Sequence, residues 1–257
     1  MRIGRQPLLA LAGVLSFLFF AAVGLPAQLA LRWLAPPGLQ VLDPQGTLWQ
    51  GSAAAVAADA VRLGPLSWSL SAAGLLTGHL RAEVSTRIGA GEASGLIEAG
   101  SAGRFACSRC LYTGPTAALG GLLPALRGTG GNLKADITVL ELRDRWPRRA
   151  VATLEFTGLP LRVPGSPAEP AAPVANFNIS IAADPVPDDG RIEATVVDGG
   201  GPVQLTGQLV ITPPGNYQLE ASARARPEAP AQIGNALALL GPRAADGSTR
   251  VGMSGSF

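Results

Sequence analysis

The stretch HLRAEVSTRIG, residues 79–89, alternates apolar and polar side chains. Successive side chains of a β-strand point to opposite faces, so this alternation is typical of a strand with one buried face. One face takes Leu80, Ala82, Val84, Thr86 and Ile88, and the other takes His79, Arg81, Glu83, Ser85 and Arg87. The stretch therefore predicts a half-buried strand, with the single histidine of the chain, His79, on its solvated face.

The same alternation returns along the rest of the chain. It is clear in NLKADITVLEL at 132–142, FNISIAA at 177–183, VQLTGQLVIT at 203–212 and RVGMSGSF at 250–257. The turn-forming sequences DPVPDDG and PPGN separate neighbouring stretches and predict β-hairpins, and glycines inside several strands predict bulges and curvature. APAQIGNALALLG at 229–241 predicts a short helix that ends at Gly241. We therefore predict a mainly β fold with a curved, mostly antiparallel sheet and one short helix near the C-terminus.

A Pro/Ala-rich segment, VPGSPAEPAAPV at 163–174, interrupts the strands. A connection of this length is unusual inside a compact domain. We predict that it joins two related β halves, residues 38–163 and 174–257.

The N-terminus carries an apolar run from Leu8 to Leu31, longer than the roughly 20 residues that a helix needs to cross a bilayer. Arg2 and Arg5 precede the run and no charged residue follows before Arg32, which favours a cytoplasmic N-terminus. We predict cytoplasmic residues 1–7, a transmembrane anchor at 8–31 and an exported β domain at 32–257. A cleavable signal peptide is the alternative, although its apolar core would be shorter, about 7–15 residues. The Ala- and Gly-rich composition is typical of a bacterial protein, so the receiving compartment would be the periplasm.

The composition and the motifs argue against several functional classes. The net charge is only +2, whereas nucleic-acid binding needs a clustered basic face. The chain has no GxSxG, P-loop, HExxH or EF-hand pattern. We predict a protein without catalytic residues, cofactor or metal.

Two cysteines, Cys107 and Cys110, form the sequence CSRC. An oxidising compartment favours a structural disulfide between them. A pair of free thiols and a redox-active CxxC are the alternatives, and a zinc site would need two further ligands where the chain offers only His79.

The sequence RDRWPRR at 143–149 is the one basic cluster. Arg143, Arg145, Arg148 and Arg149 could contact an acidic partner or lipid headgroups. The alternative is a solvated hairpin tip partly balanced by Asp144, because clusters of surface charge are common.

The sequence GTLWQGSA at 46–53 places a tryptophan between two glycines, and LSWSL follows at 66–70. We expect Gly46 and Gly51 to allow a bend in a strand that starts at Thr47, and Trp49 to pack against the next strand near Trp68. These four residues, Gly46, Trp49, Gly51 and Trp68, form a candidate structural signature.

Taken together, the anchor, GTLWQGSA, LSWSLSAAGLLTGHLRAEV and the terminal block GGPVQLTGQLVITPPGNYQLEASARARPEAP followed by IGNALALLG resemble the type II secretion system protein N family. The resemblance covers nearly the whole chain. It implies an accessory inner-membrane component of the machine that exports folded proteins, with a periplasmic β domain and with partners in the inner-membrane platform or the outer-membrane secretin. It carries over no catalytic residues and does not explain the cysteine pair.

A second hypothesis is a periplasmic lipid-binding or lipid-bridging protein, because a curved sheet on a membrane anchor can form an apolar trough. Such a trough requires a continuous accessible apolar stripe, whereas a closed core would bury it. A redox enzyme that uses the CxxC is a third hypothesis.

Overall fold

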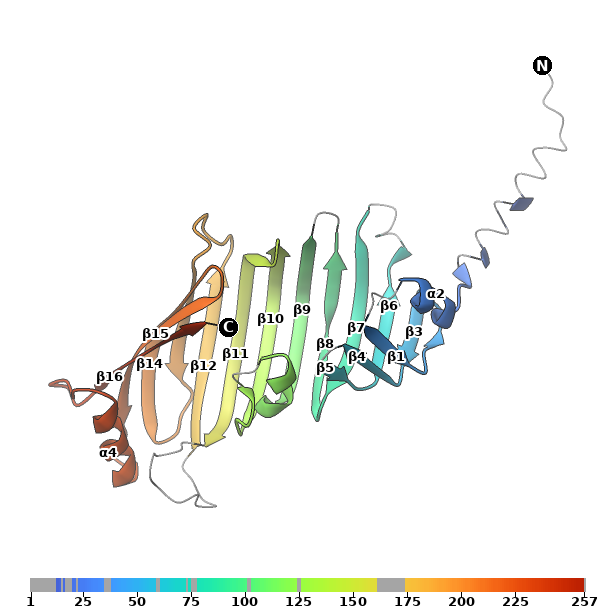
Figure 1. Ribbon diagram of the computed structural model, residues 1–257. Helices are drawn as coiled ribbons and strands as arrows, with labels where there is room; N and C mark the ends of the chain where they lie inside the picture. Colours follow the sequence, from blue (N-terminus) through green and yellow to red (C-terminus); the bar gives the residue numbers. More distant parts are fainter. Residues whose placement is uncertain are drawn as a thin grey trace.

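The computed structural model describes residues 13–14, 16, 20–21, 23–34, 38–58, 61–72, 74, 78–100, 103–123, 126–160 and 174–256. Most of this chain forms one thirteen-stranded antiparallel sheet (Figure 1). Its strands are β2 (Gln45–Gly46), β3 (Gln50–Ala53), β6 (Leu66–Leu70), β7 (Leu80–Ile88), β8 (Gly91–Ala99), β9 (Arg104–Pro115), β10 (Asn132–Arg143), β11 (Trp146–Pro160), β12 (Val174–Ala183), β13 (Ile192–Asp198), β14 (Val203–Thr212), β15 (Asn216–Ala225) and β16 (Thr249–Ser256). They lie in sequence order, short connections join half of the neighbouring pairs, and the two predicted hairpins join β12 to β13 and β14 to β15.

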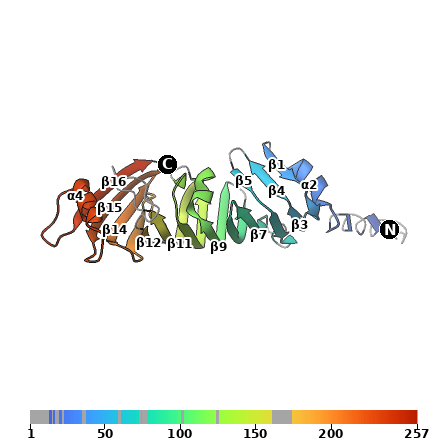
Figure 2. The same cartoon turned by 90° about the horizontal axis from the view of Figure 1, so that it is seen from below.

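A few shorter elements lie at the ends and rim of this sheet. At one end are helix α2 (Ala27–Leu34) and a small three-stranded sheet of β1 (Leu39–Leu42), β4 (Ala55–Ala58) and β5 (Val61–Leu63). The 3₁₀ helix η1 (Thr116–Gly121) follows β9, and helix α4 (Ala231–Leu240) packs against β15 and β16. Figure 2 shows the main sheet as one twisted layer, with the small sheet at one end and α4 at the other.

The two faces of the main sheet differ in chemistry along its whole width. Residues in direct register across all thirteen strands form a row that is polar except at Leu111 and Gly252, and every member is exposed. Its members are Gln45, Ser52, Ser67, Ser85, Ser94, Leu111, Asp136, Thr153, Ser180, Thr195, Gln208, Glu220 and Gly252. Because the strands keep the alternation of period two at these positions, the adjacent register position points to the opposite face.

That adjacent position forms a second row on the opposite face, in which every residue is buried or half-buried. This apolar row consists of Ala53, Leu66, Thr86, Ala93, Tyr112, Ala135, Leu154, Ile179, Val196, Gly207, Ala221 and Val251. The core cluster around Tyr112, Leu133 and Phe156 lies on this face, and the rings of Phe156 and Phe177 stack 4.7 Å apart. Burial raises the pKa of Tyr112, whose hydroxyl donates to the Pro115 carbonyl at 2.9 Å.

A single sheet buries less surface than two packed layers do. The polar face and much of the sheet rim therefore stay open to solvent.

The prediction of a mainly β, antiparallel fold with few short helices is confirmed, and α4 forms where the sequence predicted a short helix. No helix within the described ranges combines the length and apolar character that crossing a membrane requires. The predicted cytoplasmic residues 1–7 lie outside the described residues, and so do residues 8–12 and several others of the predicted anchor. Most of the Pro/Ala-rich segment also does, and β11 pairs with β12 across it, so the division into two halves stays a prediction.

Candidate docking surfaces

The two edges of the main sheet differ in how they are covered. The β2 edge has only two residues, and Thr47 beside it bridges to Pro26, while the amide of Leu48 donates to the carbonyl of Leu25 at 2.9 Å. A short, proline-flanked edge of this kind resists pairing with another chain.

The opposite edge, β16, is eight residues long and pairs with β15. Its outer side is bridged only at its first residue, by Arg243 to Thr249, among the described residues. From Arg250 onward the strand contains no proline and no lysine, and Met253 is 56% exposed. This second edge therefore presents unpaired backbone groups to a partner strand.

The signature residues gather where the chain enters the main sheet. The indole of Trp68 lies on Gly51 and donates from Nε1 to the Leu48 carbonyl at 3.0 Å. A Cβ at position 51 would overlap that ring, which is why glycine suits this position. Gly46 has a φ of +84°, which favours glycine in the turn that follows it.

Trp49 lies in the turn itself, and this corrects the expectation that a strand starts at Thr47. Residues 47–49 connect β2 to β3, and β3 starts at Gln50. The carbonyl of Trp49 accepts a hydrogen bond from the amide of Leu70 at 2.6 Å. Trp68, rather than Trp49, is the ring that covers the glycine.

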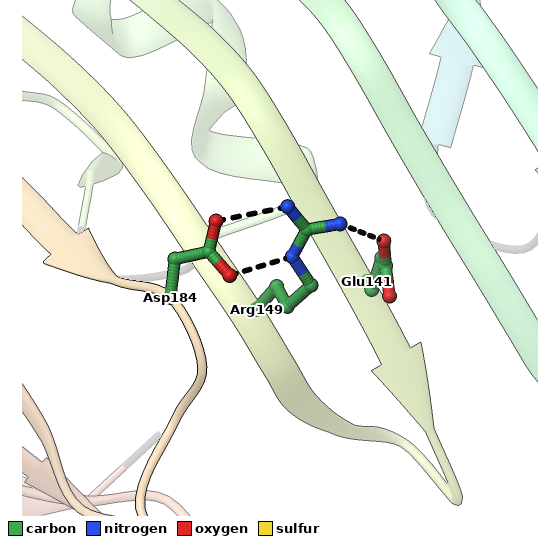
Figure 3. Close-up of polar contacts among 3 residues, drawn as sticks. All are labelled: Glu141, Arg149 and Asp184. Atoms are coloured by element: carbon green, nitrogen blue, oxygen red, sulfur yellow. Dashed lines mark hydrogen bonds and ion pairs between the residues drawn. The ribbon is translucent and has the colours of Figure 1, made fainter.

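The arginine cluster divides into one bonded residue and three exposed ones. Arg149 donates to Glu141 on β10 at 2.7 Å and to both carboxylate oxygens of Asp184 after β12, at 2.7 and 2.8 Å (Figure 3). These bonds raise the pKa of Arg149 above its usual value and lower the pKa of Asp184. Arg149 thus ties three neighbouring chain segments together.

The other three arginines, Arg143, Arg145 and Arg148, are exposed at the hairpin between β10 and β11. Asp144 and Arg145 form its tip, both with positive φ, and Trp146 fixes its base by donating from Nε1 to the Gly190 carbonyl at 3.0 Å. The hairpin therefore presents a basic surface on a well-supported turn.

The two cysteines lie on β9 at a bulge. In a regular strand, residues three apart point to opposite faces, but the pairing with β8 shifts between Ser94 and Leu96, and Arg109 has a φ of +52°. The sulfur atoms of Cys107 and Cys110 lie within bonding distance, with their Cα atoms 6.1 Å apart. Gly95 lies opposite Cys110, and a Cβ there would overlap the sulfur. The Cα separation of the two cysteines lies within the range found in disulfides, and the disulfide stays a prediction.

Across the described part of the chain, no three His, Cys, Asp or Glu side chains gather where they could hold a metal ion. The one histidine, His79, is exposed as the alternation predicted.

Sequence reasoning missed two features of these surfaces. The partners of Arg149 come from β10 and from the segment after β12, and the free edge depends on which strand lies last in the sheet. One sequence signal could have predicted the free edge: RVGMSGSF is a long strand without the proline or lysine that usually protects an edge.

An open sheet with a capped edge, a free edge and a basic hairpin defines a protein that presents surfaces to other molecules. The chain belongs to the type II secretion system protein N family. The family model, described as type II secretion system (T2SS), protein N, matches residues 37–252, which includes the main sheet apart from its last residues. As a member of this family, the chain is a component of a type II secretion system.

Two relatives bear the same name. Type II secretion system protein N of Vibrio cholerae is 27% identical over 227 residues, which is 85% of this chain and 85% of the relative. The protein of the same name from Aeromonas hydrophila is 27% identical over 246 residues, covering 92% of this chain and 93% of the relative. No solved structure matches the chain.

Proposed function

We propose that this chain is a non-enzymatic inner-membrane component that helps to assemble or stabilise the type II secretion machine. The apolar run at 8–31 anchors it, with the last residues of the run, in α2, lying against the β domain. Residues 1–7 lie in the cytoplasm and residues 32–257 lie in the periplasm. The apolar run behind Arg2 and Arg5 supports this orientation, because positive charges favour the cytoplasmic side.

The free β16 edge carries the proposal. An unpaired edge binds an extended segment of another protein by backbone hydrogen bonds, and the side chains on each face give specificity. Val251 and Met253 continue the apolar side of the sheet, whereas Arg250 and Ser254 lie on the polar side. The partner strand therefore carries apolar side chains on one face and polar ones on the other, and it belongs to the inner-membrane platform or the secretin.

Two further features have structural roles in this proposal. Arg143, Arg145 and Arg148 make a second contact, with an acidic surface of a partner. A disulfide between Cys107 and Cys110 holds the β9 bulge and has no redox role.

A Met253→Lys substitution tests the edge. Lysine at an exposed edge, pointing toward the apolar side, discourages the addition of a strand. The variant should capture fewer secretion components from detergent-solubilised membranes and should lower the export of a secreted enzyme. Met253→Leu keeps the apolar side chain and should behave as the unmodified chain does.

Val197→Lys is the charge control on an interior strand, because Val197 is 45% exposed on the polar side of β13. It should leave capture and export unchanged. Equal losses for Met253→Lys and Val197→Lys would mean that charge, rather than the edge, causes the defect. Undiminished capture and export for Met253→Lys would contradict the proposal.

A second candidate function, lipid binding, is favoured by the apolar row. Members such as Leu66, Leu154 and Ile179 are only half-buried, so part of the apolar face stays accessible. Mass spectrometry of the detergent-extracted chain should detect co-purified phospholipid at a constant ratio, and a lipid-free preparation would count against this function.

A further inference from the structure

An apolar cleft of about 190 Å³ lies between α2, the small sheet and the first strands of the main sheet. All eleven residues that line it are apolar. Ala30 and Leu31 come from α2, Val56 from β4, Trp68 from β6 and Ala82 from β7. The only side-chain N–H among the lining residues, Nε1 of Trp68, is already bonded to the Leu48 carbonyl. The cleft thus offers no polar side-chain group to a ligand.

The size of the cleft and its apolar lining indicate which kind of ligand it can bind. The cleft is open on one side, so its apolar walls face water. A ligand that covers them removes this apolar area from water, which is favourable. An aliphatic chain can pack against these apolar side chains, whereas a polar or charged ligand would find no hydrogen-bond partner among them.

The position of α2 identifies the source of that chain. Ala27, Ala30 and Leu31 line the cleft and are also the last residues of the apolar run that starts at Leu8. Just before and within α2, large apolar side chains face outward: Phe20 is 68% exposed, Val23 48% and Leu29 47%. Such a patch favours a lipid environment over water. The cleft therefore lies at the surface of the bilayer that holds the anchor.

We propose that this cleft binds an acyl chain of a phospholipid from that bilayer. Lipid enters beside α2, and its hydrocarbon lies against Trp68 and Ala82. This inference deepens the lipid-binding candidate and rests on the membrane anchor proposed above, but it does not depend on the β16 edge.

Tryptophan fluorescence in vesicles tests the proposal. The chain has four tryptophans, and two variants of the full chain keep only Trp68 or only Trp33, which follows the apolar run. Each is reconstituted into phosphatidylcholine and phosphatidylglycerol vesicles whose acyl chains carry bromine, which quenches indole on contact. We expect loss of Trp68 and of Trp33 fluorescence relative to vesicles without bromine.

Cleft-filling substitutions separate binding in the cleft from contact with bulk lipid. In the Trp68-only chain, Ala82→Leu and Ala30→Leu each fill part of the cleft and should restore the fluorescence. Ala152→Leu makes the same change on the apolar face at β11, away from the cleft, and should leave the loss unchanged. Far-UV circular dichroism confirms that each variant keeps its β structure.

The outcomes are distinct. If Trp33 is quenched and Trp68 is not, the cleft proposal is wrong and the anchor stands. If neither is quenched, both the anchor and the cleft are overturned. If Trp68 is quenched equally when either leucine fills the cleft, lipid reaches the ring from elsewhere and the proposal is also wrong. Secretion and partner capture at β16 are separate readouts.

Discussion

Gly51→Ala should destabilise the sheet where the chain enters it. The new Cβ would overlap the Trp68 ring and lie 2.6 Å from the carbonyl oxygen of Gln45, which belongs to the backbone. Trp68 cannot move aside without losing its bond to the Leu48 carbonyl. Overpacking costs about 1–3 kcal/mol and a lost hydrogen bond about 1 kcal/mol, so we expect a loss of roughly 2–4 kcal/mol in the free energy of unfolding.

The assay is urea unfolding of the full chain in detergent, followed by far-UV circular dichroism. Gly252→Ala is the matched control, since a Cβ there meets nothing within 4 Å, and its effect should stay within about 0.5 kcal/mol. A double variant with Trp68→Ala should lose less stability than the sum of the two single losses, because the two positions are in contact. If Gly51→Ala and Gly252→Ala are equally stable, the packing argument fails. If Gly51→Ala is stable but abolishes secretion, the signature is a partner contact instead.

Three further perturbations probe the ion network, the cysteines and the core. Arg149 lowers the pKa of Asp184, so the stabilisation from this pair should be complete above about pH 3.9 and should be lost as the pH falls further. Arg149→Ala should remove this pH dependence from a profile of melting temperature against pH. An unchanged profile would contradict the assignment. Mass spectrometry after alkylation should find no adduct on Cys107 or Cys110 until a reductant is added, and alkylation without reductant would show free thiols. Cys107→Ser should lower the free energy of unfolding by about 2 kcal/mol, the value expected for so short a loop. Phe156→Ala should cost about 3–5 kcal/mol in urea unfolding, because its buried ring stacks on a neighbouring strand; a loss below about 1 kcal/mol would mean that the site is not packed.

Local patterns in the sequence were enough to predict several of the strands and the short helix. The alternation around His79 became β7, and the apolar segment before Gly241 became α4, because burial of one face decides both patterns. The sequence did not show that the strands divide into a main sheet and a small one. β1, β4 and β5 are short apolar stretches like those of the main sheet, and which sheet a strand joins depends on its neighbours in space.

The candidate sites were less predictable because they depend on register. GTLWQGSA contains its own tryptophan, yet Trp68 from the paired strand covers Gly51. Arg149 looked like its exposed neighbours in the sequence, but one of its partners, Asp184, lies 35 residues away. The arrangement of Cys107 and Cys110 likewise depends on a bulge that only the pairing with β8 reveals.

The central claim is that this secretion-system component docks a partner at its free edge. A photo-reactive amino acid at Ser254, on β16, tests it in intact secreting cells, with the same amino acid at Thr195 on the interior strand β13 as the control. Illumination should yield a covalent adduct with another type II secretion component from position 254 and none from position 195. No adduct from position 254, or the same adduct from both positions, would contradict the account.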